Sequence, residues 1–190
     1  MSRHISVDTK LEDVYRYGIE ITLSSILNIG LVMGVSFILG NPLSGLCFLT
    51  CFIFLRSFCG GYHADSYFKC NTLMVILYII SYLCGRMLIY FEITDFRLMS
   101  IILMLTFLPF YAFAPVKNKH KSLSEHKAKK CKIFTIVFYV FLSLLGLLMI
   151  SFNSLYGSII IISLIEISVL ILIEILMQRR HNDENSGKDS

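Results

Sequence analysis

The sequence predicts an all-α integral membrane protein with about six transmembrane helices and an amphipathic interfacial helix at its N-terminus. The composition supports this fold class, because 56% of the 190 residues are hydrophobic and only 16% are charged. The mean hydropathy is +0.72. In a typical soluble domain, roughly a quarter of the residues are charged. The composition therefore excludes a soluble globular domain, a disordered chain and a nucleic-acid-binding protein.

The N-terminal segment predicts an interfacial helix over residues 5–18. Its apolar residues Val7, Leu11 and Val14 recur at helical spacing, with charged residues on the other face, as in helices that lie in the membrane surface. A fraying polar tail is the alternative interpretation. Because the segment before the first apolar run is polar and charged, we expect no cleavable signal peptide and a retained first span.

Long uncharged runs give the expected spans. The run over residues 21–55 is interrupted by Gly40-Asn41-Pro42, which favours a turn, so it predicts a helical hairpin. The run over residues 133–165 is broken in the same way around residues 151–154. The expected spans are residues 19–39, 43–58, 71–91, 98–114 (kinked or ended near Pro109), 133–151 and 155–177. They form one membrane domain over residues 1–180, followed by a disordered tail over 181–190.

The distribution of basic residues predicts the orientation. With six spans, both termini lie on the same side as the segments 56–69 and 116–132, and these four regions hold 15 of the 17 Lys and Arg residues. Loops rich in Lys and Arg face the cytoplasm. Both termini and the segment after the second span are therefore expected to be cytoplasmic. The seven lysines of 117–132 fit attraction to anionic lipid or an acidic partner, or serve only to fix the topology.

The segment from Arg56 to Asn71, between the second and third spans, is the candidate site. It contains Gly60-Gly61, and His63 lies seven residues before Cys70. A cysteine nucleophile reacts as the thiolate and is favoured by a neighbouring base and by the N-terminus of a helix, where Cys70 is expected. Residues seven apart on a continuous helix are separated by about 10 Å along its axis. Contact therefore requires the chain to fold back, which glycines permit.

Other interpretations of this segment remain open. The histidine and cysteine can be a chance pairing with no catalytic role, and Cys59, four residues before His63, is a rival nucleophile. Asp65 is either a group that orients His63 or a solvated carboxylate. Cys59, His63 and Cys70 also suggest metal ligands, but no Cys-x-x-Cys pair or second cluster supports a metal site, so neither metal nor cofactor is expected.

At these residues the sequence resembles the accessory gene regulator protein B (AgrB) family, membrane cysteine endopeptidases of Gram-positive bacteria. The shared pattern is an arginine, Gly-Gly-x-His-Ala, and a cysteine seven residues after the histidine, here Arg56, Gly60-Gly61-Tyr62-His63-Ala64 and Cys70. A second match is the proline-plus-basic segment Ala114-Pro115-Val116-Lys117-Asn118-Lys119. Length, amphipathic N-terminus and six spans also agree, so the resemblance covers nearly the whole chain.

The resemblance implies an enzyme of the bacterial cell membrane, a thiol protease that cleaves an AgrD-like pro-peptide on its C-terminal side. Cleavage through a thioester would promote cyclisation to a thiolactone or lactone quorum-sensing pheromone of the kind that regulates virulence. Cys70 would be the nucleophile and His63 the general base and acid. Arg56 and the glycines Gly60 and Gly61 would support the loop, or Arg56 would bind a substrate carboxylate.

Charges within the spans suggest an alternative function. Glu166 and Glu174 share a helix face in the last span, and Arg86 in the third span is their expected partner. These residues predict a buried ion pair or, in a non-enzymatic small transporter or immunity-type protein, the functional site itself. Small residues, namely Gly30, Gly34 and Ser25, allow either a homodimer or close packing within the bundle.

Overall fold

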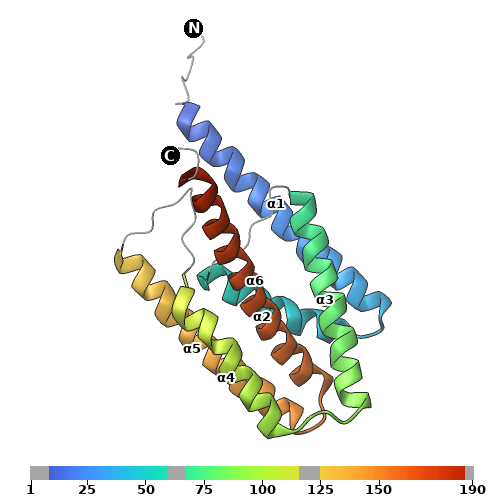
Figure 1. The fold of residues 1–190 in the computed structure, drawn as a ribbon. Coiled ribbons are helices and arrows are strands. Elements are labelled where there is room, and N and C mark those ends of the chain that lie inside the picture. The colour runs from blue at the N-terminus through green and yellow to red at the C-terminus, as the bar shows by residue number, and fades with distance from the viewer. Residues whose placement is uncertain (1–8, 60–66, 116–124, 187–190) are drawn as a thin grey trace.

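The computed structural model describes residues 9–59, 67–115 and 125–186. Within these ranges the chain forms six helices and no strand (Figure 1). In chain order the helices are α1 (Thr9–Ile38), α2 (Pro42–Cys59), α3 (Tyr67–Tyr90), α4 (Phe96–Phe113), α5 (Glu125–Ile150) and α6 (Leu155–Ser186). The predicted all-α fold is confirmed.

Five of these helices, α2 to α6, are long and apolar enough to cross a membrane. The apolar part of α1 is shorter and covers Thr22–Ile38. An α-helix rises about 1.5 Å per residue, so each of the five reaches across most or all of the hydrocarbon. The chain is therefore a multi-pass helical membrane protein.

The turn between α1 and α2 forms where Gly40-Asn41-Pro42 predicted it. Gly40 adopts a φ of +70°, in the left-handed region that glycine tolerates. The Asn41 side-chain oxygen accepts a hydrogen bond from the Ser44 backbone N–H at 3.3 Å and so caps the new helix. Pro42 occupies the first helical position, where a missing N–H has no cost.

Some helix boundaries differ from the expected ones. The described part of the interfacial helix and the first span form one continuous helix from Thr9, because Gly18 at their boundary weakens a helix without ending it. The fifth helix begins at Glu125 rather than residue 133, since lysine, alanine and glutamate are good helix formers outside the hydrocarbon. The fourth continues through Pro109 to Phe113. The last extends to Ser186, so part of the expected disordered tail is helical.

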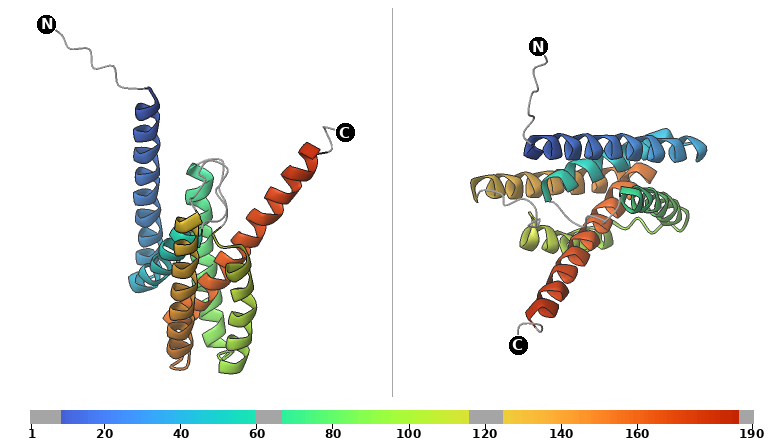
Figure 2. Two further views of the ribbon diagram at one scale, coloured as in Figure 1. Left: turned by 90° about the vertical axis from the view of Figure 1, so that its left-hand side faces the viewer. Right: turned by 90° about the horizontal axis from the view of Figure 1, so that it is seen from above.

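The centre of the molecule is α6, which packs against α2, α3, α4 and α5, whereas α1 packs against α2 and α3. Close approach depends on small residues: a side-chain carbon at Gly157 would lie 2.5 Å from the Ile150 backbone nitrogen. Figure 2 shows the last turns of α6 projecting from the bundle, where Leu176 and Met177 are exposed. The start of α1 and the end of α6 lie at the same end of the bundle (Figure 1).

Candidate active site

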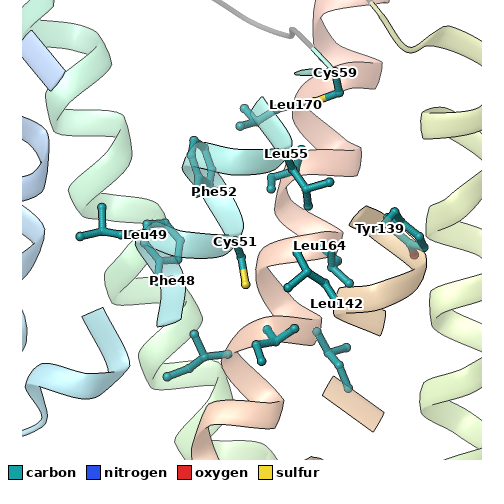
Figure 3. Close-up of a cluster of buried hydrophobic side chains, with 14 of the residues drawn as sticks. Phe48, Leu49, Cys51, Phe52, Leu55, Cys59, Tyr139, Leu142, Leu164 and Leu170 are labelled. Atoms are coloured by element: carbon teal, nitrogen blue, oxygen red, sulfur yellow. The ribbon is translucent and has the colours of Figure 1, made fainter. Parts of the chain in front are cut away.

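The end of α2 contains a buried cysteine. Cys59, the last residue of α2, is 0% exposed and belongs to the main cluster of buried hydrophobic side chains. Figure 3 shows it with Leu55 of the same helix and with Leu170 of α6 in this cluster. An apolar environment disfavours the thiolate, so Cys59 has the surroundings of a structural rather than a reactive cysteine.

One turn earlier, Arg56 lies half-buried in the last turn of α2. Its guanidinium carbon is 5.5 Å from the centre of the Phe52 ring, which is a cation–π geometry. The ring itself is buried in the core. The positive charge of Arg56 is thereby held at the end of α2 where the candidate loop begins.

Cys70 lies in the first turn of α3 and is half-buried. The residues at helical spacing from it, Met74, Tyr78 and Ser81, are all buried, so Cys70 begins the face of α3 that packs into the bundle. The neighbouring Lys69 is exposed. At the start of a helix, backbone N–H groups lack intrahelical partners and the helix dipole favours negative charge. The position suits a thiolate and an oxyanion.

The remaining candidate residues, Gly60, Gly61, His63 and Asp65, lie in residues 60–66, outside the described part of the chain. The distance between His63 and Cys70 and the roles of the glycines and of Asp65 therefore stay predictions, as does the absence of a metal site. In the second matched segment, Ala114 is buried and ends α4, and residues 116–124 are likewise outside the described ranges.

Two contacts near this end of the bundle were not predicted from the sequence. The rings of Phe58 and Phe134 stack with centroids 5.4 Å apart, which holds the basic start of α5 beside the end of α2. The Ser24 hydroxyl of α1 donates a hydrogen bond of 2.9 Å to the side-chain oxygen of Asn71, next to Cys70. The sequence offers no signal for either, because both join residues far apart in the chain.

The charges within the spans are arranged differently from the expected ion pair. The carboxylate of Glu166 accepts a hydrogen bond of 2.9 Å from the Ser81 hydroxyl. The other oxygen of Glu166 has no hydrogen-bond partner among the described residues and Arg86 is exposed, so the predicted pairing is wrong. Glu174 accepts a hydrogen bond of 2.7 Å from Gln178, one turn further along α6. The reason is rotational: Ser81 faces α6, and Arg86, five residues later, points to another side of α3.

The helices and their composition define a polytopic α-helical membrane protein. Residues 1–176 match the family described as accessory gene regulator B. The chain therefore belongs to the AgrB family. It is 28% identical over 162 residues to "Putative AgrB-like protein 2" of Clostridium perfringens (strain 13 / Type A), covering 78% of this chain and 73% of that protein.

A second relative is "Putative AgrB-like protein" of Clostridium perfringens (strain SM101 / Type A), which is 27% identical over 162 residues. This match also covers 78% of this chain and 73% of the relative. No solved structure gives a significant match to the chain. The family match spans every residue of the candidate site, from Arg56 to Cys70, and all helices up to the last turns of α6. The predicted family is confirmed.

Proposed function

We propose that this protein is a membrane-embedded cysteine endopeptidase that cleaves an AgrD-type pro-peptide on its C-terminal side and promotes cyclisation of the product. AgrB family membership implies a pro-peptide of this type as the substrate. The product would be a thiolactone or lactone pheromone for quorum sensing. The observation that carries the proposal is the position of Cys70, half-buried in the first turn of α3 with His63 seven residues before it.

The surroundings of the two candidate nucleophiles favour Cys70. Cys59 is 0% exposed within the hydrophobic core, where a peptide bond has no access to its sulfur. Cys70 is only half-buried and lies at the N-terminal end of its helix, where backbone N–H groups lack intrahelical partners. We therefore assign the nucleophile to Cys70 and the general base to His63.

The proposed reaction is acyl transfer in two steps. His63 accepts the thiol proton of Cys70, and the thiolate attacks the carbonyl carbon of the scissile peptide bond. The backbone N–H groups of the first turn of α3 are suitable donors to the resulting oxyanion. When the tetrahedral intermediate collapses, the C–N bond breaks, His63 gives its proton to the leaving amine, and the acyl group remains on Cys70 as a thioester.

The second step releases the product. A cysteine or serine side chain within the bound peptide loses its proton to His63 and attacks the thioester carbonyl, forming the ring and restoring the Cys70 thiol. A thioester and a thiolactone are chemically alike, so this exchange is nearly balanced. Exclusion of water favours ring closure over hydrolysis. The inward-facing side of α3 on which Cys70 lies provides such an environment.

The supporting residues take roles at the ends of the loop. Arg56, anchored over the Phe52 ring, either holds the loop or binds a carboxylate of the substrate. Gly60 and Gly61 would allow the backbone to turn His63 toward Cys70, and Asp65 is a candidate for orienting His63. We propose that both termini and this loop face the cytoplasm of a bacterial cell, since basic residues concentrate at that end of the bundle.

Mass spectrometry of the reconstituted protein tests the proposal. A synthetic precursor peptide taken from the reading frame beside the gene is incubated with vesicles carrying wild type, Cys70→Ser or Cys59→Ser. We expect a C-terminal cut with wild type and Cys59→Ser, an acyl adduct on Cys70, and loss of at least about 10³-fold in rate with Cys70→Ser. Cleavage that persists in Cys70→Ser at equal protein abundance would refute the assignment.

A further inference from the structure

One hydrogen bond connects α1 with the start of α3. The Ser24 hydroxyl donates to the side-chain oxygen of Asn71 at 2.9 Å, across 47 residues of sequence. Both side chains are half-buried. Asn71 is the residue directly after Cys70, so this hydrogen bond connects α1 to the helical turn that contains the proposed nucleophile.

The helical geometry relates the direction of Asn71 to that of Cys70. Successive residues on an α-helix are rotated by about 100°, since 3.6 residues complete a turn. When Asn71 points to Ser24 on α1, Cys70 points along the neighbouring face, the one continued by the buried Met74 and Ser81. A rotation of this first turn would swing the Cys70 sulfur away from the bundle.

The first turn of α3 depends on such a contact more than the rest of the helix does. Terminal turns have fewer intrahelical hydrogen bonds than interior ones and fray unless side chains tie them down. Further along α3, the Tyr82 hydroxyl donates to the carbonyl of Leu39, in the turn that follows α1, at 3.4 Å. The Ser24–Asn71 hydrogen bond therefore fixes how α1 and α3, which pack together, are aligned at the end of the bundle that contains Cys70.

We propose that Ser24 and Asn71 are positioning residues for Cys70, through which α1 sets the direction of the nucleophile. The catalytic consequence rests on the proposed function. Neither residue touches the reacting atoms: they act by holding the first turn of α3. A misplacement of about 1 Å in a reacting group can cost up to about 100-fold in rate. Loss of the hydrogen bond should therefore slow the chemical step without weakening substrate binding.

The chain offers a matched control at the opposite end of the bundle. There the Thr94 hydroxyl donates to the side-chain oxygen of Asn153 at 3.0 Å. This hydrogen bond has the same kind of donor and acceptor, and it joins the α3–α4 loop to the α5–α6 loop. Thr94→Ala removes an equivalent bond far from Cys70. Ser24→Thr keeps a hydroxyl at the tested position and serves as the conservative variant.

The kinetic experiment compares Ser24→Ala, Asn71→Ala, the double variant, Ser24→Thr and Thr94→Ala in vesicles, at matched amounts of folded protein. We expect kcat to fall about 10-fold in each alanine variant at Ser24 and Asn71, with KM within about twofold of wild type. The double variant should be no slower than either single variant, because both remove one interaction. Ser24→Thr and Thr94→Ala should resemble wild type.

A substrate-free measurement separates this proposal from the proposed function. Iodoacetamide labelling is followed by peptide mass spectrometry at about pH 10, where thiols in water are mostly ionised and the rate reports access. Cys70 should react at least about threefold faster in Ser24→Ala than in wild type, with Cys131, half-buried near the start of α5, as internal reference.

The outcomes are distinct. Unchanged labelling of Cys70 in Ser24→Ala, or an equal effect of Thr94→Ala, would overturn the positioning role whether or not the protein is a peptidase. Cleavage that survives in Cys70→Ser, together with faster labelling of Cys70 in Ser24→Ala, would overturn the proposed nucleophile while upholding the contact that directs its side chain. Additive losses in the double variant would also count against the shared role.

Discussion

The Ser81 hydroxyl of α3 donates a hydrogen bond of 2.9 Å to Oε2 of Glu166, which lies on the central helix α6. Glu166 is only 8% exposed, and its other oxygen, Oε1, has no partner among the described residues. An ionised carboxylate within a span is costly unless it is paired. The hydrogen bond from Ser81 therefore needs only an acceptor oxygen at residue 166 and does not need a negative charge there.

This relationship predicts that Glu166→Gln is tolerated. The amide oxygen can still accept the hydrogen bond from Ser81, so we expect abundance in the membrane and pro-peptide cleavage to stay within about twofold of wild type. Quantitative immunoblotting and the vesicle cleavage assay measure both, with Arg86→Gln as a comparison at an exposed site. Severe loss of cleavage in Glu166→Gln with intact folding would contradict this prediction and show that the carboxyl group itself is required.

The close packing of α5 against α6 predicts that Gly157→Ala destabilises the fold. A side-chain carbon there would lie 2.5 Å from the Ile150 nitrogen and 2.8 Å from Met149 atoms, so the backbone must shift. Such overpacking typically costs about 1–3 kcal/mol. Thermal unfolding in detergent measures the change.

Gly34→Ala is the matched control for this prediction, because nothing lies within 4 Å of the added carbon. In a helix, alanine is favoured over glycine by about 0.5–1 kcal/mol, so stability should be unchanged or slightly higher. A destabilisation equal to that of Gly157→Ala would show that this face of α1 packs against another molecule.

The buried pair of Ser44 and Tyr78 predicts a measurable coupling between α2 and α3. Their hydroxyl oxygens are 2.7 Å apart, and both side chains are 0% exposed. Tyr78→Phe should lower the free energy of unfolding by about 1 kcal/mol, the usual net value of a buried hydrogen bond. A double-mutant cycle with Ser44→Ala should give a coupling energy of at least about 0.5 kcal/mol. Complete additivity of the two changes would contradict the contact.

Cysteine burial predicts selective modification of the native protein. Cys59 and Cys51 are buried, so neither should react with a polar maleimide, whereas the half-buried Cys70 should. Peptide mass spectrometry before and after unfolding in sodium dodecyl sulfate measures each site. Labelling of Cys59 at the rate of Cys70 in the native protein would contradict the packing at the end of α2 and restore Cys59 as a candidate nucleophile.

Several features followed from local rules that act between neighbours in the sequence. The turn at Gly40-Asn41-Pro42 needed only a residue that tolerates positive φ, a capping side chain and a proline at the first helical position. Within the described residues, α2 to α6 followed from the lengths of uncharged runs, whereas the separate interfacial helix that we expected is continuous with the first span. The motif from Arg56 to Cys70 indicated the family, which the match over residues 1–176 confirms. The roles of His63 and Cys70 within it stay predictions.

The sequence by itself determined that this chain is an all-helical membrane protein of the AgrB family, because composition, turns and a short motif are local properties. Only the tertiary structure decided that α6 is central, that Cys59 is buried while Cys70 is partly accessible, and that Glu166 bonds Ser81 rather than Arg86. The physical reason is that lipid-facing and protein-facing surfaces are both apolar, so hydrophobicity does not distinguish them. Packing between residues far apart in the chain does.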